Sequence, residues 1–212
     1  MATFVLIHGG GGSAWHWRLV EPELRAHGHD VVAVDLPVED ESAGLGDYAD
    51  AVVEAVGDRR DLVVVAHSWG GFVGPLVCDR VKADLLVLVT AMIPAPGEPP
   101  ADWWGNTGFS APAMDDTVAV FMQDVPPDLA AEVMTTGREH AEKALGEPWP
   151  LDRWPDVPTK FVLCRDDRFF TPAFMREVVR ERLGVVPDEI DAGHSPMLSR
   201  PEELAALLES YL

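Results

Sequence analysis

The amino-acid sequence predicts an α/β protein with one mostly parallel β-sheet and helices on both faces. Two observations support this prediction. Short apolar runs alternate along the 212 residues with segments of helical spacing. The runs are continuously apolar, as strands are when a parallel sheet buries them on both faces. Four such runs are present and two further strand candidates follow later in the chain, so we expect six strands in one domain, residues 1–212, around one core.

The expected elements can be placed from these patterns. The strands should cover residues 3–7, 31–34, 62–66, 85–89, 159–164 and 185–190. Helices are expected at 45–56, directly after residue 68, at 172–183 and at 201–212. Pro172 and Pro201 suit the first turn of a helix, because an amide proton there has no partner within the helix.

The alternation stops between residues 93 and 155, and we interpret this stretch as an inserted lid. It contains no strand candidate, several prolines and two patches of helical spacing, at 114–122 and 128–143. Its aromatic residues either form a small core of the lid itself or roof an apolar substrate pocket. The pocket candidates are Trp103, Trp104, Phe109 and Phe121, together with Gly9 outside the lid.

The composition narrows the possible partners. Asp and Glu outnumber Lys and Arg by 36 to 16, for a net charge of −20, so the chain should repel nucleic acids and anionic membranes. The two cysteines lack metal-ligand spacing and are too few for a disulfide framework, and we expect no metal and no cofactor. With no basic leader and no apolar run as long as a membrane span, we expect a cytoplasmic protein, either monomer or homodimer.

The most informative stretch runs from residue 63 to residue 74, where an apolar strand leads directly into a glycine-rich helix start. Ser68 lies at the junction, with small residues, Ala66 and Gly70, two positions to either side. Small flanking residues permit a turn so sharp that the serine hydroxyl projects above the sheet. The pattern predicts a nucleophile elbow, with Ala66 where the usual motif has glycine. A plain strand-to-helix turn with an incidental serine is the alternative.

Ligands of an open parallel sheet bind beyond the carboxyl ends of its strands, so catalytic groups are expected in the loops that follow them. After the first strand, His8, Gly9 and Gly10 offer backbone amides that no side chain screens. Such amides suit one half of an oxyanion hole, and the amide of Trp69, just after the serine, suits the other half.

A carboxylate and a histidine follow the last two strands. Asp166 and Asp167 come after the fifth strand, and His194 comes after the sixth. A serine hydroxyl is a poor nucleophile near neutral pH and needs a histidine to accept its proton. That histidine needs a carboxylate to orient it and to stabilise its charge. His194 can serve Ser68 in this way, and either aspartate can reach the imidazole.

Serine, acid and histidine in this chain order, each just past a strand end, resemble the α/β-hydrolase superfamily over nearly the whole chain. Shorter motifs are similar to the plant methylesterase and hydroxynitrile lyase branch of that superfamily. They are Phe4-Val-Leu-Ile-His-Gly-Gly10, Trp15-x-Trp17, Val32-Ala-Val-Asp-Leu36, His67-Ser-x-Gly-Gly71, Cys164-x-x-Asp167 and Gly193-His194.

The resemblance implies an α/β-hydrolase fold with six strands in the order 2-1-3-4-5-6 and a small helical lid. It also implies that Gly10 and Trp69 supply the oxyanion amides. Asp167, rather than the aspartate before it, would complete a triad with Ser68 and His194. The expected activity is hydrolysis of a small or medium apolar carboxylic ester through an acyl-enzyme, with that small molecule as the partner.

Other functions stay open. Thioesterases, lactonases and carbon–carbon bond hydrolases can use the same triad. A hydroxynitrile lyase is a further alternative, but Gly9 and Ser195 stand where similar lyases carry Thr and Lys, so the cation that would hold departing cyanide is missing. A dinucleotide-binding oxidoreductase is suggested by Gly9-x-Gly11-x-x-Ala14 with Asp35 about 20 residues on, but it leaves the elbow unexplained. A non-catalytic ligand-binding protein on the same fold is the third class.

Overall fold

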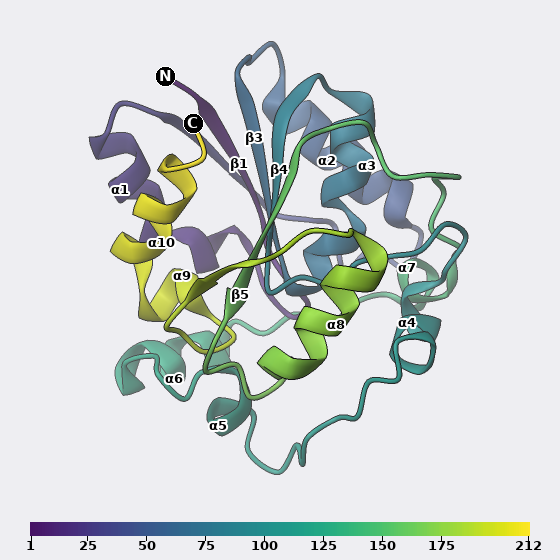
Figure 1. Ribbon diagram of the computed structural model, residues 1–212, viewed down its shortest axis with the longest axis vertical. Coiled ribbons are helices and arrows are strands. Elements are labelled where there is room, and N and C mark those ends of the chain that lie inside the picture. The colour runs from purple at the N-terminus through teal and green to yellow at the C-terminus, as the bar shows by residue number, and fades with distance from the viewer.

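The six predicted strands are present as parallel strands in the computed structural model, which describes residues 1–212 (Figure 1). The strands are β1 (Thr3–Ile7), β2 (Asp30–Val34), β3 (Leu62–His67), β4 (Ala83–Val89), β5 (Thr159–Cys164) and β6 (Asp188–Ile190). Every neighbouring pair is parallel, and the order is β2-β1-β3-β4-β5-β6. The predicted sheet and strand order are confirmed.

The last strand is shorter than the sequence predicts. It begins at Asp188 rather than at Val185, and its pairing with β5 starts at the same residue. Pro187 has no amide proton to donate to a neighbouring strand, and Val186 is 91% exposed at this edge of the sheet. The proline therefore confines the predicted edge strand to its last three residues.

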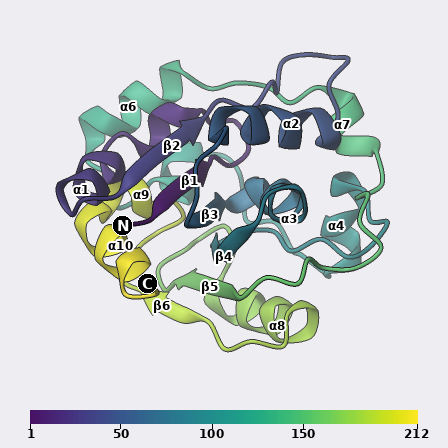
Figure 2. The same cartoon turned by 90° about the horizontal axis from the view of Figure 1, so that it is seen from above.

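Helices cover both faces of the sheet (Figure 2). One face carries α2 (Leu45–Val56), α3 (Gly74–Arg80) and α8 (Pro172–Arg182), and the other carries α1 (Val20–Ala26), α9 (Pro196–Ser199) and α10 (Pro201–Glu209). Successive side chains of a strand point to opposite faces. Val5 and Ile7 of β1 accordingly belong to the core under α2, whereas Phe4 and Leu6 belong to the core under α1.

The insertion between β4 and β5 consists of helices and loops without a strand. Its helices are α4 (Pro100–Asn106), α5 (Thr117–Phe121), α6 (Pro127–Thr135) and α7 (Glu142–Gly146). The insertion has no core of its own, because Trp103 and Trp149 join the core under α2 while Met122 and Val125 join the core under α1. It spans both layers, with α5 and α6 beyond the carboxyl ends of the strands, away from the two chain termini (Figure 1).

One long helix expected in the insertion is broken. The sequence predicts helix over 128–143, but α6 ends at Thr135 and α7 begins at Glu142. Between them the backbone bonds to loops of the sheet: the Arg138 amide donates to the Gly11 carbonyl at 3.2 Å, and the Ala141 amide donates to the Val38 carbonyl at 2.8 Å. These tertiary hydrogen bonds replace the helical ones.

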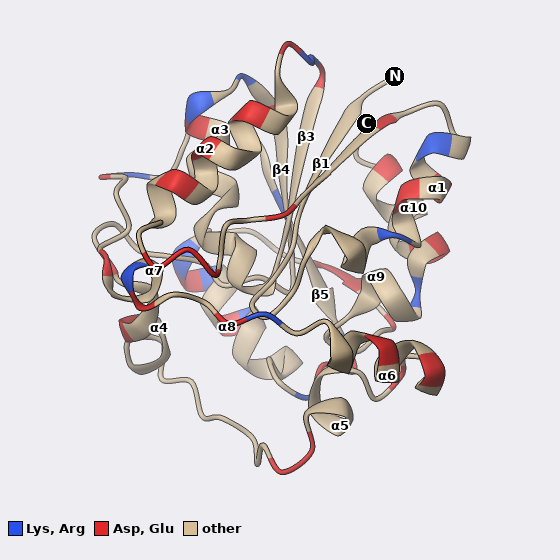
Figure 3. Cartoon of the chain, turned by 180° about the vertical axis from the view of Figure 1, so that it is seen from behind, with Lys and Arg blue, Asp and Glu red and all other residues tan.

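Acidic residues outnumber basic ones and are spread over the whole protein. Asp and Glu occur in both helix layers and in the connecting loops, whereas Lys and Arg are fewer (Figure 3). No helix of the protein combines the length and the apolar character that crossing a membrane requires.

Candidate active site

Ser68 lies at the sharp turn that the sequence predicts. It directly follows β3 and begins a short 3-10 helix, η2 (Ser68–Phe72), with a φ of 51°. A positive φ is strained for a residue with a side chain, and such strain is typical of functional turns. A Cβ at Gly70 would lie 2.7 Å from the carbonyl oxygen of His8, so only glycine lets the turn pack against β1. The backbone thus fixes the direction of the serine hydroxyl.

His194 joins the serine to a carboxylate. Its Nε2 is 3.0 Å from Ser68 Oγ, and its Nδ1 is 2.8 Å from Oδ2 of Asp167. All three residues are buried. The structure therefore brings together the three predicted side chains from loops after β3, β5 and β6. Asp166 is exposed, and its carboxylate makes no contact with the imidazole.

Asp167 is held by hydrogen bonds to both carboxylate oxygens. Thr90 Oγ1 donates to Oδ2 at 2.6 Å. The amides of Phe169 and Phe170 donate to Oδ1 at 2.8 and 2.9 Å. These partners offset the cost of burying a carboxylate. Sequence analysis missed Thr90, although it directly follows β4 and the rule that ligands gather at strand ends would have indicated it.

His67 is a second residue whose role sequence analysis did not assign. Its Nε2 lies 2.8 Å from the carbonyl oxygen of His194 and must donate to it. Burial lowers the pKa of His67 well below its usual value, and the nearby His194 adds to this shift. The ring therefore stays neutral and holds the main chain of His194 without adding a positive charge beside it.

A cavity of about 380 Å³ opens above Ser68. One wall is the glycine loop after β1 with His16 and Trp69. The other apolar residues that line the cavity are Met92, Trp104, Phe121, Met122, Val133, Met134 and Phe169. No Lys, Arg, Asp or Glu lines this cavity. Its size and its apolar wall suit a small or medium uncharged molecule.

The structure supports only part of the predicted pocket. Gly9, Trp104 and Phe121 line the cavity, whereas Trp103 and Phe109 do not, which corrects the prediction for these two residues. Trp103 is fully buried, and its indole nitrogen donates to the main chain at 3.0 Å. Phe109 packs behind Trp104, with ring centroids 5.1 Å apart. Adjacent residues of α4 face different sides of the helix, and sequence analysis could not tell which tryptophan faces the cavity.

Gly10 and Trp69 lie beside each other in the lining of the cavity. A Cβ at Gly10 would be 3.5 Å from the Cβ of Trp69, and the Gly10 amide makes no hydrogen bond with a backbone carbonyl. A Cβ at Gly9 would lie 2.8 Å from the Cβ of Ser68. Glycine at this position therefore keeps the approach to the serine open.

The carboxylate that a dinucleotide-binding loop would need has another role. Asp35 Oδ1 accepts a hydrogen bond from the Ala14 amide at 2.7 Å, at the start of the 3-10 helix η1 (Ala14–Trp17). This bond ties the loop after β2 to the loop after β1. The glycines of that loop line the cavity above Ser68. Asp35 thus supports the glycine loop that lines the cavity above Ser68.

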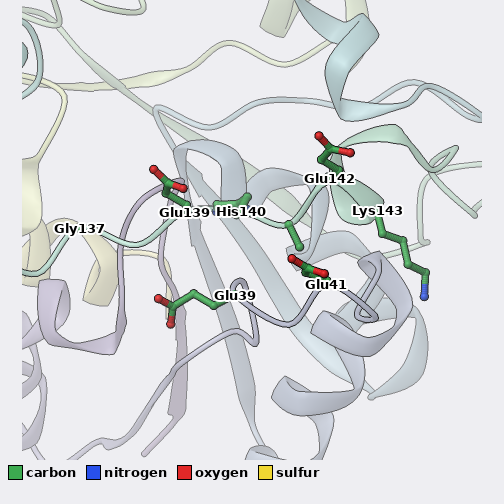
Figure 4. A pocket seen from close by; sticks show the side chains of 8 residues that line it. Glu39, Glu41, Gly137, Glu139, His140, Glu142 and Lys143 are labelled. Carbon is green, nitrogen blue, oxygen red and sulfur yellow. The ribbon is translucent and has the colours of Figure 1, made fainter.

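A wider hollow of about 1000 Å³ lies beside the cavity, between the insertion and the loop after β2. Its charged side chains are Glu39, Glu41, Glu139, Glu142 and Lys143 (Figure 4). Gly137 lines both spaces. Arg138 pairs with Glu39 at 3.1 Å, and the remaining carboxylates outnumber the single lysine. The hollow therefore places a negative potential next to the cavity, which disfavours anionic ligands.

Titratable side chains near the cavity wall are kept neutral. His140 lines the hollow and packs on Trp69, with ring centroids 4.3 Å apart. Burial lowers the pKa of His140 to about 4. Burial also lowers the pKa of His16. No three His, Cys, Asp or Glu side chains lie close enough together to hold a metal ion.

Known proteins are similar to this chain over nearly its whole length. The model of the alpha/beta hydrolase family matches residues 4–207. Methylesterase 7 from Arabidopsis thaliana is 30% identical over 249 residues, which cover 97% of this chain and 94% of that protein. Polyneuridine aldehyde esterase from Rauvolfia serpentina is 27% identical over 247 residues, which cover 97% and 93%.

A solved structure has the same fold. A crystal structure of polyneuridine aldehyde esterase superposes with a TM-score of 0.86 at 23% identity, covering 100% of this chain and 99% of the other. The alignment with Methylesterase 7 is longer than the 212 residues of this chain, so that relative carries segments that are absent here. The family match over nearly the whole sequence decides the assignment. This chain belongs to the alpha/beta hydrolase family.

Proposed function

We propose that this protein is a serine hydrolase that cleaves a small or medium, uncharged carboxylic ester through an acyl-enzyme on Ser68. The observation that carries the proposal is the continuous chain of hydrogen bonds from Ser68 through His194 to Asp167, at 3.0 and 2.8 Å. Ser68, at one end of these hydrogen bonds, lines the largely apolar cavity. Relatives named as methylesterase and aldehyde esterase support the same reaction class.

The mechanism follows from the contacts. His194 Nε2 accepts the proton of Ser68 as Oγ attacks the ester carbonyl carbon, and Asp167 stabilises the resulting imidazolium. The amides of Gly10 and Trp69 donate to the oxyanion of the tetrahedral intermediate. His194 then returns the proton to the leaving alkoxide, and the alcohol departs. Water, activated by the same imidazole, attacks the acyl-enzyme and releases the acid.

The surroundings of the cavity favour neutral substrates. No charged side chain lines its wall to pair with a substrate carboxylate or phosphate, and the adjoining hollow is acidic. A cyanohydrin lyase would need a cation to hold the departing cyanide. Ser195, the residue after the histidine, instead donates its hydroxyl to the Phe121 carbonyl at 3.0 Å. Ester hydrolysis therefore fits the site better than cyanide release.

A fluorophosphonate probe should label wild-type protein at a single serine, because only an activated hydroxyl attacks such a probe at a useful rate. Intact-protein mass spectrometry should show one adduct, and peptide mapping should place it on Ser68. The Ser68→Ala protein should show none. An adduct that persists in Ser68→Ala, or a wild-type protein that stays unlabelled while folded, would contradict the proposed nucleophile.

The two adjacent tryptophans of α4 should respond differently to truncation. Trp104→Ala enlarges the cavity and should change the relative rates on short and long acyl esters, and it should cost less stability than Trp103→Ala because Trp104 is only partly buried. Trp103→Ala should lower the free energy of unfolding by about 3–5 kcal/mol, because it removes a fully buried side chain. An ester panel and denaturant unfolding measure the two effects. Equal losses on all esters in Trp104→Ala would mean that this side chain does not contact the acyl group.

A further inference from the structure

Asp167 and His194 reach the site on two separate loops. We call residues 165–170, after β5, the acid loop and residues 191–195, after β6, the histidine loop. Near the strand ends the loops share a backbone hydrogen bond, from the Asp166 amide to the Ala192 carbonyl at 3.0 Å. Apart from that bond, the distance between the Asp167 carboxylate and the His194 imidazole depends on the contacts that hold each loop.

The segment of the lid at the end of α5 contacts both loops. Gln123 Nε2 donates to the Asp166 carbonyl at 2.7 Å, and the Gly193 amide donates to Asp124 Oδ2 at 2.8 Å. The Ser195 hydroxyl donates to the lid at the Phe121 carbonyl, as described above. Each of the three loop residues is the direct sequence neighbour of Asp167 or His194. The lid therefore contacts the acid loop and the histidine loop next to their functional residues.

We propose that Gln123 and Asp124 are positioning residues that hold the acid loop and the histidine loop at the distance that the reaction needs. The proposal rests on the proposed function, since it takes Ser68, Asp167 and His194 as the reacting groups. Neither Gln123 nor Asp124 lines the cavity, so neither touches substrate. Their effect must pass through the loops that they bind.

The polar character of this pair supports a role beyond attaching the lid. Gln123 Oε1 and Asp124 Oδ1 are buried without a hydrogen-bond partner. Burying such atoms costs free energy, and apolar side chains would attach a lid without that cost. The atoms that do bond, Gln123 Nε2 and Asp124 Oδ2, are the ones directed to the two loops.

The histidine loop is shaped to receive the pair. A Cβ at Gly193 would overlap with Gln123 Nε2 and with Asp124 Oδ1, so the absence of a side chain there lets both groups approach. The hydrogen bond that the Gly193 amide donates to the Asp124 carboxylate is charge-assisted and therefore strong. His194 is thus held on its N-terminal side by Asp124 and at its own carbonyl by His67. Loss of either bond frees one end of the residue.

The expected effect is on turnover rather than on binding. A displacement of about 1 Å at a reacting group can cost about 10²-fold in rate. Asp124→Ala should therefore lower kcat by about 10-fold to 100-fold, and Gln123→Ala by about 10-fold, with KM changed by less than about threefold. Asp124→Asn keeps an acceptor oxygen for the Gly193 amide and should recover most of the rate. Asp115→Ala removes an exposed lid carboxylate without a hydrogen bond and should match wild type.

A spectroscopic measurement separates positioning from general loosening of the lid. The Nδ1 proton of His194, which bonds to Asp167, should give a resolved downfield resonance in proton NMR of the wild-type protein. In Asp124→Ala and Gln123→Ala this resonance should broaden or shift, whereas in Asp124→Asn and Asp115→Ala it should not. If Asp124→Ala does not fold, Gln123→Ala and Gly193→Ala give the same test, because a methyl at position 193 displaces both lid side chains.

The outcomes are distinct. Unchanged kcat and an unchanged histidine resonance in both alanine variants would overturn the positioning role, and so would a change in KM alone. If the wild-type protein hydrolyses no ester and takes up no fluorophosphonate, the proposed function fails. The resonance would still decide in that case whether Gln123 and Asp124 hold His194 against Asp167.

Discussion

His194→Ala is expected to lower kcat for ester hydrolysis by roughly 10⁶-fold. Without the imidazole, Ser68 keeps its proton and the leaving alkoxide finds no acid. The oxyanion amides and substrate binding alone should sustain only about 10³-fold to 10⁴-fold acceleration over water. Steady-state rates on one chromogenic ester measure the loss, and the rate of fluorophosphonate labelling should fall in parallel.

His16→Ala is the matched control. His16 lines the same cavity, but its Nδ1 bonds to the Ser13 amide at 3.2 Å and no contact joins it to Ser68. Its loss should change kcat by less than about 10-fold, as for a residue that only shapes the cavity. A crippled His16→Ala enzyme beside a nearly normal His194→Ala enzyme would show that the base has been assigned to the wrong ring.

The strands and their order could be predicted because buried parallel strands depend on local apolar runs and on few topological choices. The residues that meet at the candidate active site could be predicted for a related reason. Ser68 directly follows β3, and Asp167 and His194 lie in the loops that follow β5 and β6, so the parallel sheet brings all three to one edge. The resemblance to a family then distinguished Asp167 from its neighbour, and the 2.8 Å contact with His194 agrees with that choice.

What could not be predicted depends on contacts between distant segments. Which of Trp103 and Trp104 faces the cavity depends on how α4 is rotated against the core. The sequence alone does not distinguish two adjacent tryptophans. The break in the expected helix at 128–143 comes from hydrogen bonds to loops more than a hundred residues away. Gln123 and Asp124 belong to no sequence motif. Their partners are backbone atoms of other loops, which every residue type carries, so no pattern of side chains indicates the contact.

Asp167→Asn is expected to lower kcat by roughly 10⁴-fold, whereas Asp166→Asn should cost about 10-fold or less. The amides of Phe169 and Phe170 must still find an acceptor, so the oxygen of the new side chain should take the place of Oδ1. Its NH₂ group then faces His194 Nδ1. An amide that donates to Nδ1 places the imidazole proton on Nε2, where it can no longer accept the proton of Ser68.

The neighbouring substitution supplies the control, because it makes the same chemical change one residue away. The Asp166 carboxylate is exposed and makes no hydrogen bond, so its loss removes only a surface charge. Rates on one ester, with denaturant unfolding to confirm that both variants are folded, decide between the two. A crippled Asp166→Asn beside a nearly normal Asp167→Asn would overturn the assignment of the acid, although the hydrolase proposal would stand on Ser68 and His194. Wild-type rates in both variants would instead mean that no carboxylate orients His194 during turnover.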